Sequence, residues 1–149
     1  LKVVAPTTPE DAYALMRTAI SDPDPVIYLE QKYLYRRKKA ELQPRPPQLP
    51  LAQARIAQTG DKLTVLAYAN GVELACQAAE KLAGVEVIDL RTLVPWDHQT
   101  VAASVAKTGA LFVSVRPWSC LRTSRLRSTF LTHRKLPCAA AFAWPRILG

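Results

Sequence analysis

The sequence predicts an α/β protein in which strands and helices alternate to form parallel sheets. Short apolar runs rich in branched residues alternate with amphipathic helical segments, and this order occurs on both sides of a proline-rich stretch. The composition agrees, because a chain of 149 residues with 49% hydrophobic and 21% charged residues is typical of a globular protein.

The first series is a strand, a helix and a second strand. Residues 1–4 form the end of a buried strand, and residues 26–29 form a short buried strand. Between them, Thr8 can cap a helix that begins at Pro9 and covers residues 9–21. Its apolar face consists of Ala12, Leu15, Met16, Ala19 and Ile20. This order predicts parallel strands that are joined by a right-handed crossover.

A linker follows this series. Residues 36–39 are all basic, and four prolines lie between Gln43 and Pro50, which favours an extended and fairly stiff chain. We expect the basic run to be a solvated surface at the edge of a domain. The predicted organisation is the end of a domain at 1–35, a linker at 36–54, a second domain at 55–115 and a basic tail at 116–149.

The second series begins with a strand at residues 62–68. A helix follows, which Asn70 caps and Gly84 ends, and the next strand is predicted at 85–90. The buried face of that helix consists of Val72, Ala75, Cys76, Ala79 and Leu82.

Another helix begins at Pro95-Trp96-Asp97 and is closed by Gly109, and a strand at 110–115 comes after it. Val101, Ala102 and Val105 are expected to face inward. We therefore predict a parallel sheet that is covered by helices on both faces.

The basic charge is concentrated in the tail. Residues 1–115 hold 13 Lys and Arg against 12 Asp and Glu, whereas residues 116–149 hold seven Lys and Arg and no acid. The tail also shows no sustained helical or strand period, so it receives no structural prediction. A basic segment of this kind can contact nucleic acid, and Trp118 and Trp144 could stack on bases, but no known reader motif is present.

Few residues indicate catalysis. The sequence has no glycine-rich phosphate loop, and His98 and His133 share no metal-ligand spacing with a cysteine. We expect His98 to lie on the surface and Cys76 to be a small core residue. Cys76, Cys120 and Cys138 form no CxxC pair, which is typical of a reducing compartment.

One local feature suits a cation. The predicted helix ends at Ala19-Ile20-Ser21-Asp22, just before Asp24. The last carbonyls of a helix carry partial negative charge, and oxygen ligands suit hard cations. The simpler interpretation, a helix end that is bound by water, stays open from these residues alone.

Two segments resemble a known family. They are LKVVAPTTPEDAYALMRTAISDPDPVIYLEQKYLYR and, after the linker, LTVLAYANGVELACQAAEKLAGVEVIDLRTLVPWD, in which DLRTLVPWD is the strongest match. They resemble the end of the pyrimidine-binding domain and the start of the transketolase-like C-terminal domain in β subunits of thiamine-diphosphate-dependent 2-oxo acid dehydrogenases. Pyruvate, branched-chain and acetoin enzymes belong to this family. Transketolase and deoxyxylulose-phosphate synthase are similar more distantly.

The resemblance covers residues 1 to about 115 and implies a fragment without catalytic residues. In the family, the glutamate that activates the cofactor and an active-site histidine precede the position of residue 1, and the diphosphate and magnesium sites belong to the α subunit. The implied reaction decarboxylates a 2-oxo acid and passes the acyl group to a lipoyl group. The implied partners are the α subunit and a second β subunit, in a heterotetramer, and the dihydrolipoyl acyltransferase core. No association with a membrane is implied.

The resemblance also implies a structural potassium site. Its ligands, carried over to this chain, are Ala19 and Ile20 through backbone oxygens, with Asp22 and Asp24. Relatives often have Asn at the position of Asp24. The remaining ligands would precede residue 1, so we leave open whether this chain alone binds potassium.

We therefore expect an internal fragment of a dehydrogenase β subunit, inactive alone and cytoplasmic, or in the mitochondrial matrix of a eukaryote. The tail departs from the family, which predicts a shifted reading frame, with a genuine basic extension as the alternative. A small binding module with a nucleic-acid-contacting tail is the other function considered, although we do not expect a nucleic-acid partner.

Overall fold

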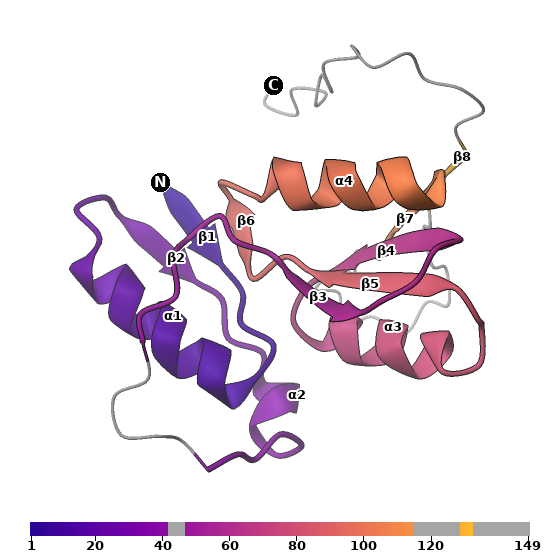
Figure 1. Ribbon diagram of the computed structural model, residues 1–149. Coiled ribbons are helices and arrows are strands. Elements are labelled where there is room, and N and C mark those ends of the chain that lie inside the picture. Colours follow the sequence, from indigo (N-terminus) through magenta and orange to yellow (C-terminus); the bar gives the residue numbers. More distant parts are fainter. Residues whose placement is uncertain (42–46, 115–128, 133–149) are drawn as a thin grey trace.

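The computed structural model describes residues 1–41, 47–114 and 129–132 and contains two sheets (Figure 1). A three-stranded sheet has the order β2-β1-β6, and a five-stranded sheet has the order β3-β5-β4-β7-β8. The α/β class is confirmed, but both sheets are mixed, because antiparallel strands flank the parallel ones.

The smaller sheet contains the first predicted series. Strand β1 (Lys2–Val4) pairs in parallel with β2 (Val26–Tyr28), and helix α1 (Pro9–Ser21) connects them. The predicted bounds of this helix are confirmed, and the Thr8 side chain accepts the amide hydrogen of Asp11, as expected of a cap. The three-residue strand β6 (Thr92–Val94) pairs antiparallel with the other edge of β1.

Three burial predictions in this region are wrong. Leu1 is 72% exposed and precedes β1, Ile27 is 43% exposed and Ile20 is 77% exposed, although all three were expected inside. The hydroxyl of Tyr28 donates to the carbonyl of Ala12 at 2.6 Å, so Tyr28 faces α1. Because successive side chains of a strand point to opposite faces, Ile27 points away from that helix.

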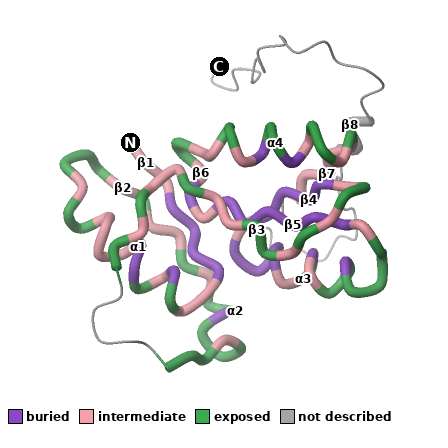
Figure 2. The backbone as a smooth tube through the Cα atoms, in the orientation of Figure 1, coloured by how far each residue is buried: buried purple, intermediate pink, exposed green. Residues whose placement is uncertain are grey.

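The larger sheet has a parallel centre. Strand β4 (Leu63–Ala67) lies between β5 (Val85–Asp89) and β7 (Ala110–Val113). Helices α3 (Asn70–Ala79) and α4 (His98–Thr108) cover its opposite faces (Figure 1). The buried residues concentrate in β4 and β5 (Figure 2). Coverage of both faces is thus confirmed.

Details of the two helices differ from the predictions. Ala69 is the N-cap of α3, so Asn70 is the first helical residue and does not cap it. The helix ends at Ala79, and Leu82 beyond it is 58% exposed. Ala102, expected inside, is exposed on α4.

The predicted end of α4 at Gly109 is confirmed, but the helix begins at His98 rather than at Pro95. Asp97 is its N-cap and accepts the amide hydrogen of Thr100 at 3.0 Å. Gly109 ends it in the left-handed conformation with φ 72°. Val101 is buried against the sheet.

Three short elements before the basic tail were not predicted from the sequence: helix α2 (Lys32–Tyr35), strand β3 (Arg55–Gln58) and strand β6. Each has only three or four residues, which is too short for a period to show. Strand β6 follows β5 in the chain but joins the sheet of β1, and it therefore connects the two predicted domains.

Part of the basic tail is a strand. Strand β8 (Thr129–Thr132) pairs antiparallel with β7 at the edge of the larger sheet. The other residues singled out in the tail, Trp118, Cys120, His133, Cys138 and Trp144, lie outside the described residues. No helix in the part of the chain that the structure describes has the length and apolar character needed to span a bilayer.

Candidate functional site

The predicted cation site lies at the end of α1. Asp22 caps the helix, and its Oδ1 accepts the amide hydrogen of Asp24 at 2.9 Å. The Lys2 ammonium group contacts both Asp22 carboxylate oxygens at 2.7 and 2.8 Å and the Asp24 Oδ2 at 3.1 Å. The hydrogen bond from Lys2 lowers the pKa of Asp22. The two carboxylates therefore already bind one cation, which belongs to this chain.

The main chain at this helix end also presents oxygen atoms. Pro23 has no N–H, so it cannot donate to the carbonyl of Ala19 four residues earlier. The Asp24 amide, which a continued helix would direct at the carbonyl of Ile20, donates to Asp22 instead. The carbonyls of Ala19 and Ile20 thus lack the amide donors that a longer helix would supply, and oxygen atoms of this kind are the ligands that hard cations take.

A buried charge cluster, which the sequence analysis missed, lies between the two sheets. Asp89, fully buried at the end of β5, accepts hydrogen bonds from Thr7 Oγ1 at 3.0 Å and from Arg55 at 2.9 Å. Asp11 of α1 is 5% exposed and pairs with Arg91 at 2.9 Å, and Arg55 lies 3.6 Å from it. Residues of the first series and of DLRTLVPWD thus share one network, whose only sequence signal was the motif itself.

Burial raises the pKa of Asp89, and Arg55 and Thr7 oppose this shift. Two carboxylates and two guanidinium groups balance one another, which is the usual requirement for charges inside a protein. The backbone of Arg91 adopts φ 57°, and its carbonyl accepts the amide hydrogen of Ala5 at 2.8 Å. The cluster joins the sheets, and within the described residues Asp11 Oδ2, Arg55 Nε and Arg91 Nε are buried without a hydrogen-bond partner.

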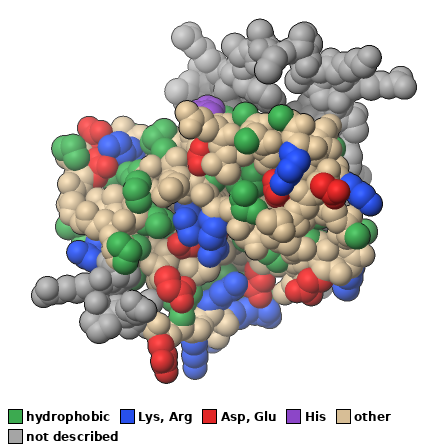
Figure 3. All heavy atoms as spheres, in the orientation of Figure 1, with side chains coloured by type: hydrophobic (Ala, Val, Ile, Leu, Met, Phe, Trp, Pro, Cys, Tyr) green, Lys and Arg blue, Asp and Glu red, His purple; other side chains and the backbone are tan. Residues whose placement is uncertain are grey.

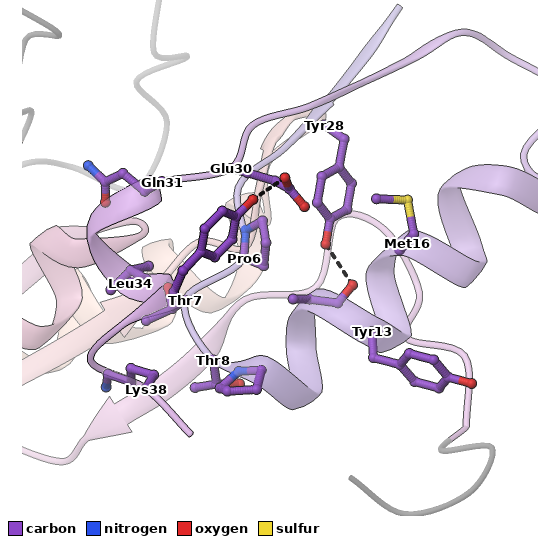
Figure 4. Close-up of a pocket in the computed structure, with 13 residues that line it drawn as sticks. Pro6, Thr7, Thr8, Tyr13, Met16, Tyr28, Glu30, Gln31, Leu34 and Lys38 are labelled. Carbon is purple, nitrogen blue, oxygen red and sulfur yellow. Dashed lines mark hydrogen bonds between the residues drawn. The ribbon is translucent and has the colours of Figure 1, made fainter. Parts of the chain in front are cut away.

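A cavity of about 420 Å³ lies where β1 and β2 end and α1 and α2 begin (Figure 4). It is lined by Pro6, Thr7, Thr8, Pro9, Ala12, Tyr13, Met16, Tyr28, Glu30, Gln31, Leu34, Tyr35 and Lys38.

The polar groups of this cavity are mostly engaged. Tyr28 donates to the Ala12 carbonyl, a bond that Figure 4 draws, while Thr7 donates to Asp89 and Tyr35 donates to the Glu30 carboxylate. Burial raises the pKa of Tyr28, so its phenol stays protonated at neutral pH. Apolar side chains, among them Pro6, Met16 and Leu34, form much of the remaining wall, and the arrangement suits an apolar or aromatic group rather than acid–base chemistry.

The other residues that the sequence analysis considered, His98 and Cys76, have surroundings typical of structural rather than catalytic residues. His98 is exposed, with its ring 3.7 Å from that of Trp96, which confirms the surface prediction. Cys76, a residue of α3, packs against the core, as predicted, and burial raises the pKa of its thiol. Among the described residues, no three His, Cys, Asp or Glu side chains lie close enough to hold a metal ion.

The comparisons with known proteins first define a class. Residues 52–115 match the family model of the transketolase C-terminal domain. A solved structure described as a split-gene transketolase, an inactive β4 tetramer, has a TM-score of 0.63 and 22% identity, over 76% of this chain and 38% of that one. The larger sheet with its helices is therefore a transketolase C-terminal-like domain.

Sequence relatives define the chain more narrowly. The pyruvate dehydrogenase E1 component β subunit of Acholeplasma laidlawii is 43% identical over 117 residues, which cover 76% of this chain and 36% of the relative. That of Mycoplasma genitalium is 39% identical over 137 residues, which cover 89% and 42%. Further relatives are β subunits of branched-chain 2-oxo acid dehydrogenases. The chain is homologous to these β subunits and spans less than half of their length.

The M. genitalium alignment bears on the tail. Because it covers 89% of the chain, it includes residues beyond 115. The expectation that the resemblance ends at about residue 115 is therefore wrong for this relative.

Proposed function

We propose that this chain is part of the β subunit of a thiamine-diphosphate-dependent 2-oxo acid dehydrogenase, in which it supplies sheet structure and subunit contacts. The main support for this proposal is the homology to such subunits, which extends over most of the chain. The transketolase likeness, at 22% identity, supports the fold alone, so the dehydrogenase is the better assignment.

When bound in such an enzyme, thiamine diphosphate supplies the nucleophile and electron sink for decarboxylation of the 2-oxo acid. The described residues do not fit this cofactor: no cluster of acids could hold its magnesium ion, and the carboxylate at the cavity, Glu30, is bound by Tyr35. We therefore assign the cofactor site to other parts of the enzyme and derive no catalytic step within this chain.

The proposed partners are the α subunit, a second β subunit and the dihydrolipoyl acyltransferase core that receives the acyl group, in a heterotetrameric dehydrogenase. The proposed location is the cytoplasm, or the mitochondrial matrix in a eukaryote. Neither a membrane nor nucleic acid enters this proposal.

A chimeric subunit tests the function. Residues 1–113 would replace the matching segment of the A. laidlawii β subunit, which would be co-expressed with its α subunit. We expect the chimera to co-purify with the α subunit and to reduce a dye acceptor with pyruvate and thiamine diphosphate, whereas the isolated chain does neither. A well-folded chimera that does not assemble would contradict the proposal, and turnover by the isolated chain would show that catalytic groups are present.

We further propose that the end of α1 binds potassium in the assembled subunit. The oxygens of Ala19, Ile20, Asp22 and Asp24 support this, and the Lys2 ammonium group is the competitor. In the chimera, potassium chloride should raise the thermal midpoint above that in choline chloride of equal ionic strength. Asp22→Asn should abolish the difference and Lys2→Met should enlarge it. Equal midpoints in both salts for all three proteins would exclude the site.

A further inference from the structure

We propose that α2 and the basic run after it form a docking surface for an acidic peptide segment of a partner protein, which places an apolar side chain in the adjoining cavity. This proposal does not depend on the proposed function. The surface, named here the basic surface, consists of Lys32, Tyr33, Tyr35, Arg36, Arg37, Lys38 and Lys39.

The basic surface carries five cations, none of which forms an ion pair with another described residue. All twelve acidic residues of the chain lie among the described residues, and the ion pairs there involve Lys2, Arg55, Arg91 and Lys107, none of which belongs to this surface. Glu30, the acid nearest in sequence before it, is bound by the Tyr35 hydroxyl. In the lower part of Figure 3, Lys and Arg side chains lie around the position of α2, with Asp and Glu side chains among them.

Exposed aromatic rings accompany these charges. Tyr33 is 47% exposed and Tyr35 is 58% exposed. The guanidinium carbon of Arg37 lies 4.5 Å from the centre of the Tyr33 ring, which holds both side chains in place before any partner arrives. Tyrosine and arginine are the residue types enriched at the energetically important positions of protein interfaces.

The cavity lies directly beside this surface and shares Tyr35 and Lys38 with it. Its volume of about 420 Å³ exceeds that of a single aromatic side chain, and its walls include Pro6, Met16 and Leu34. A peptide with one apolar side chain between carboxylates would therefore meet an apolar hole with cations at its rim. Charge and shape both indicate this occupant.

Nucleic acid fits the same surface less well. Arg37 covers one face of Tyr33, which reduces the ring surface that is open to base stacking. Aliphatic walls favour a side chain over a hydrogen-bonding base.

Binding can be measured by fluorescence anisotropy on the full chain. The probe is a fluorescein-labelled ten-residue peptide with a central phenylalanine flanked by aspartates and glutamates. We expect saturable binding that weakens with salt, and binding weaker by about tenfold when glycine replaces the phenylalanine, because a buried aromatic side chain contributes that much or more. Equal affinity for both peptides would refute insertion into the cavity.

Charge reversal separates this surface from the basic tail. Arg36→Glu with Arg37→Glu should weaken binding by about tenfold or more. Lys62→Glu with Lys81→Glu, at two exposed lysines beside the larger sheet, changes the net charge equally and should have little effect. Equal weakening by both pairs would show that only net charge matters and would overturn the proposal.

The cavity needs its own variant. Ala12→Leu fills part of it without removing the carbonyl that Tyr28 binds, and it should weaken the phenylalanine peptide but not the glycine peptide. Circular dichroism establishes that each variant folds. A single-stranded oligonucleotide of equal charge serves as the competing ligand. If it bound more tightly than the peptide, and the Arg36→Glu, Arg37→Glu variant lost this binding, the partner would be nucleic acid and the proposal of a peptide would be wrong.

Discussion

Glu86 is an acid inside the larger sheet, in a strand that is buried throughout. Its carboxylate accepts hydrogen bonds from Ser104, Lys107 and the amide of Gly60. Burial alone would raise the pKa of Glu86, but these bonds outweigh burial and lower the pKa below its ordinary value. One side chain thus fixes α4 on the sheet.

Glu86→Gln tests this at the residue scale. The variant keeps the shape but loses the charge, so we expect about 2 kcal/mol less stability at pH 7. Because the folded-state pKa is the lower one, the contribution is present above the unfolded value of 4.5 and is lost as the pH falls through the folded value. Urea unfolding at several pH values should show the difference shrinking in acid. A constant difference would contradict this assignment.

Two positions, one at the end of a helix and one in a turn, require glycine for different reasons. Gly109 has φ 72°, and a Cβ at this position would meet no atom within 4 Å, so only the backbone conformation requires glycine. Gly60 lies against the main chain of Val85 and Glu86, where a Cβ would collide with backbone atoms. The first position ends a helix, and the second allows the turn before β4 to approach β5.

At the element scale, we expect Gly109→Ala to cost about 1–2 kcal/mol and Gly109→Asn less, because Asn tolerates the left-handed region better. Gly60→Ala should cost more than about 2 kcal/mol, since the backbone must move. Urea denaturation followed by circular dichroism measures all three. A smaller effect at Gly60 than at Gly109 would show that the turn yields more easily than its packing indicates.

On the scale of the whole molecule, the two sheets are held together by Asp89 and its neighbours. Thr7 and Asp11 come from the first predicted domain, and Arg55, Asp89 and Arg91 come from the second. The pairing of β6 with β1 adds a backbone connection. The sheets therefore share both charge pairs and hydrogen bonds across their junction.

Asp89→Ala should destabilise the molecule by about 3 kcal/mol, because it leaves Arg55 without its main partner in a buried cluster. Thr7→Val removes one neutral hydrogen bond to the same carboxylate and should cost about 1 kcal/mol. The two variants are compared by urea unfolding. Similar costs would mean that the ion pair adds little at the junction.

The tail gives a prediction about the gene. If residues 116–149 are read out of frame, another frame after the codon for Val115 should encode an acidic, glycine-containing segment with a helical period. Resequencing of the DNA and the intact mass of the protein decide this. If no frame gives such a segment, the basic extension is genuine. The M. genitalium alignment, which extends beyond residue 115, favours this second outcome.

The sequence alone determined the parts of the fold that depend on local signals. The bounds of α1 followed from Thr8, Pro9 and the proline after Asp22, and α4 followed from Asp97 and Gly109. Caps, prolines and glycines act on their immediate neighbours, so their effects can be read along the chain. The central strands β4 and β5 followed from runs of branched residues for the same reason.

Only the tertiary structure decided what depends on distant partners. Strand β6 has three residues, and nothing local indicates that it pairs with β1 rather than with its neighbour β5. Ile20 of α1 and Ile27 of β2 are exposed because the packing of this helix and this strand directs them away from the core. Hydrophobicity alone does not reveal that direction. Asp11 and Asp89 are 78 positions apart in the sequence, yet Arg55 contacts both. Charges of this kind are tolerated inside only when folding brings their counterions to them, so the cluster becomes visible in the folded molecule alone.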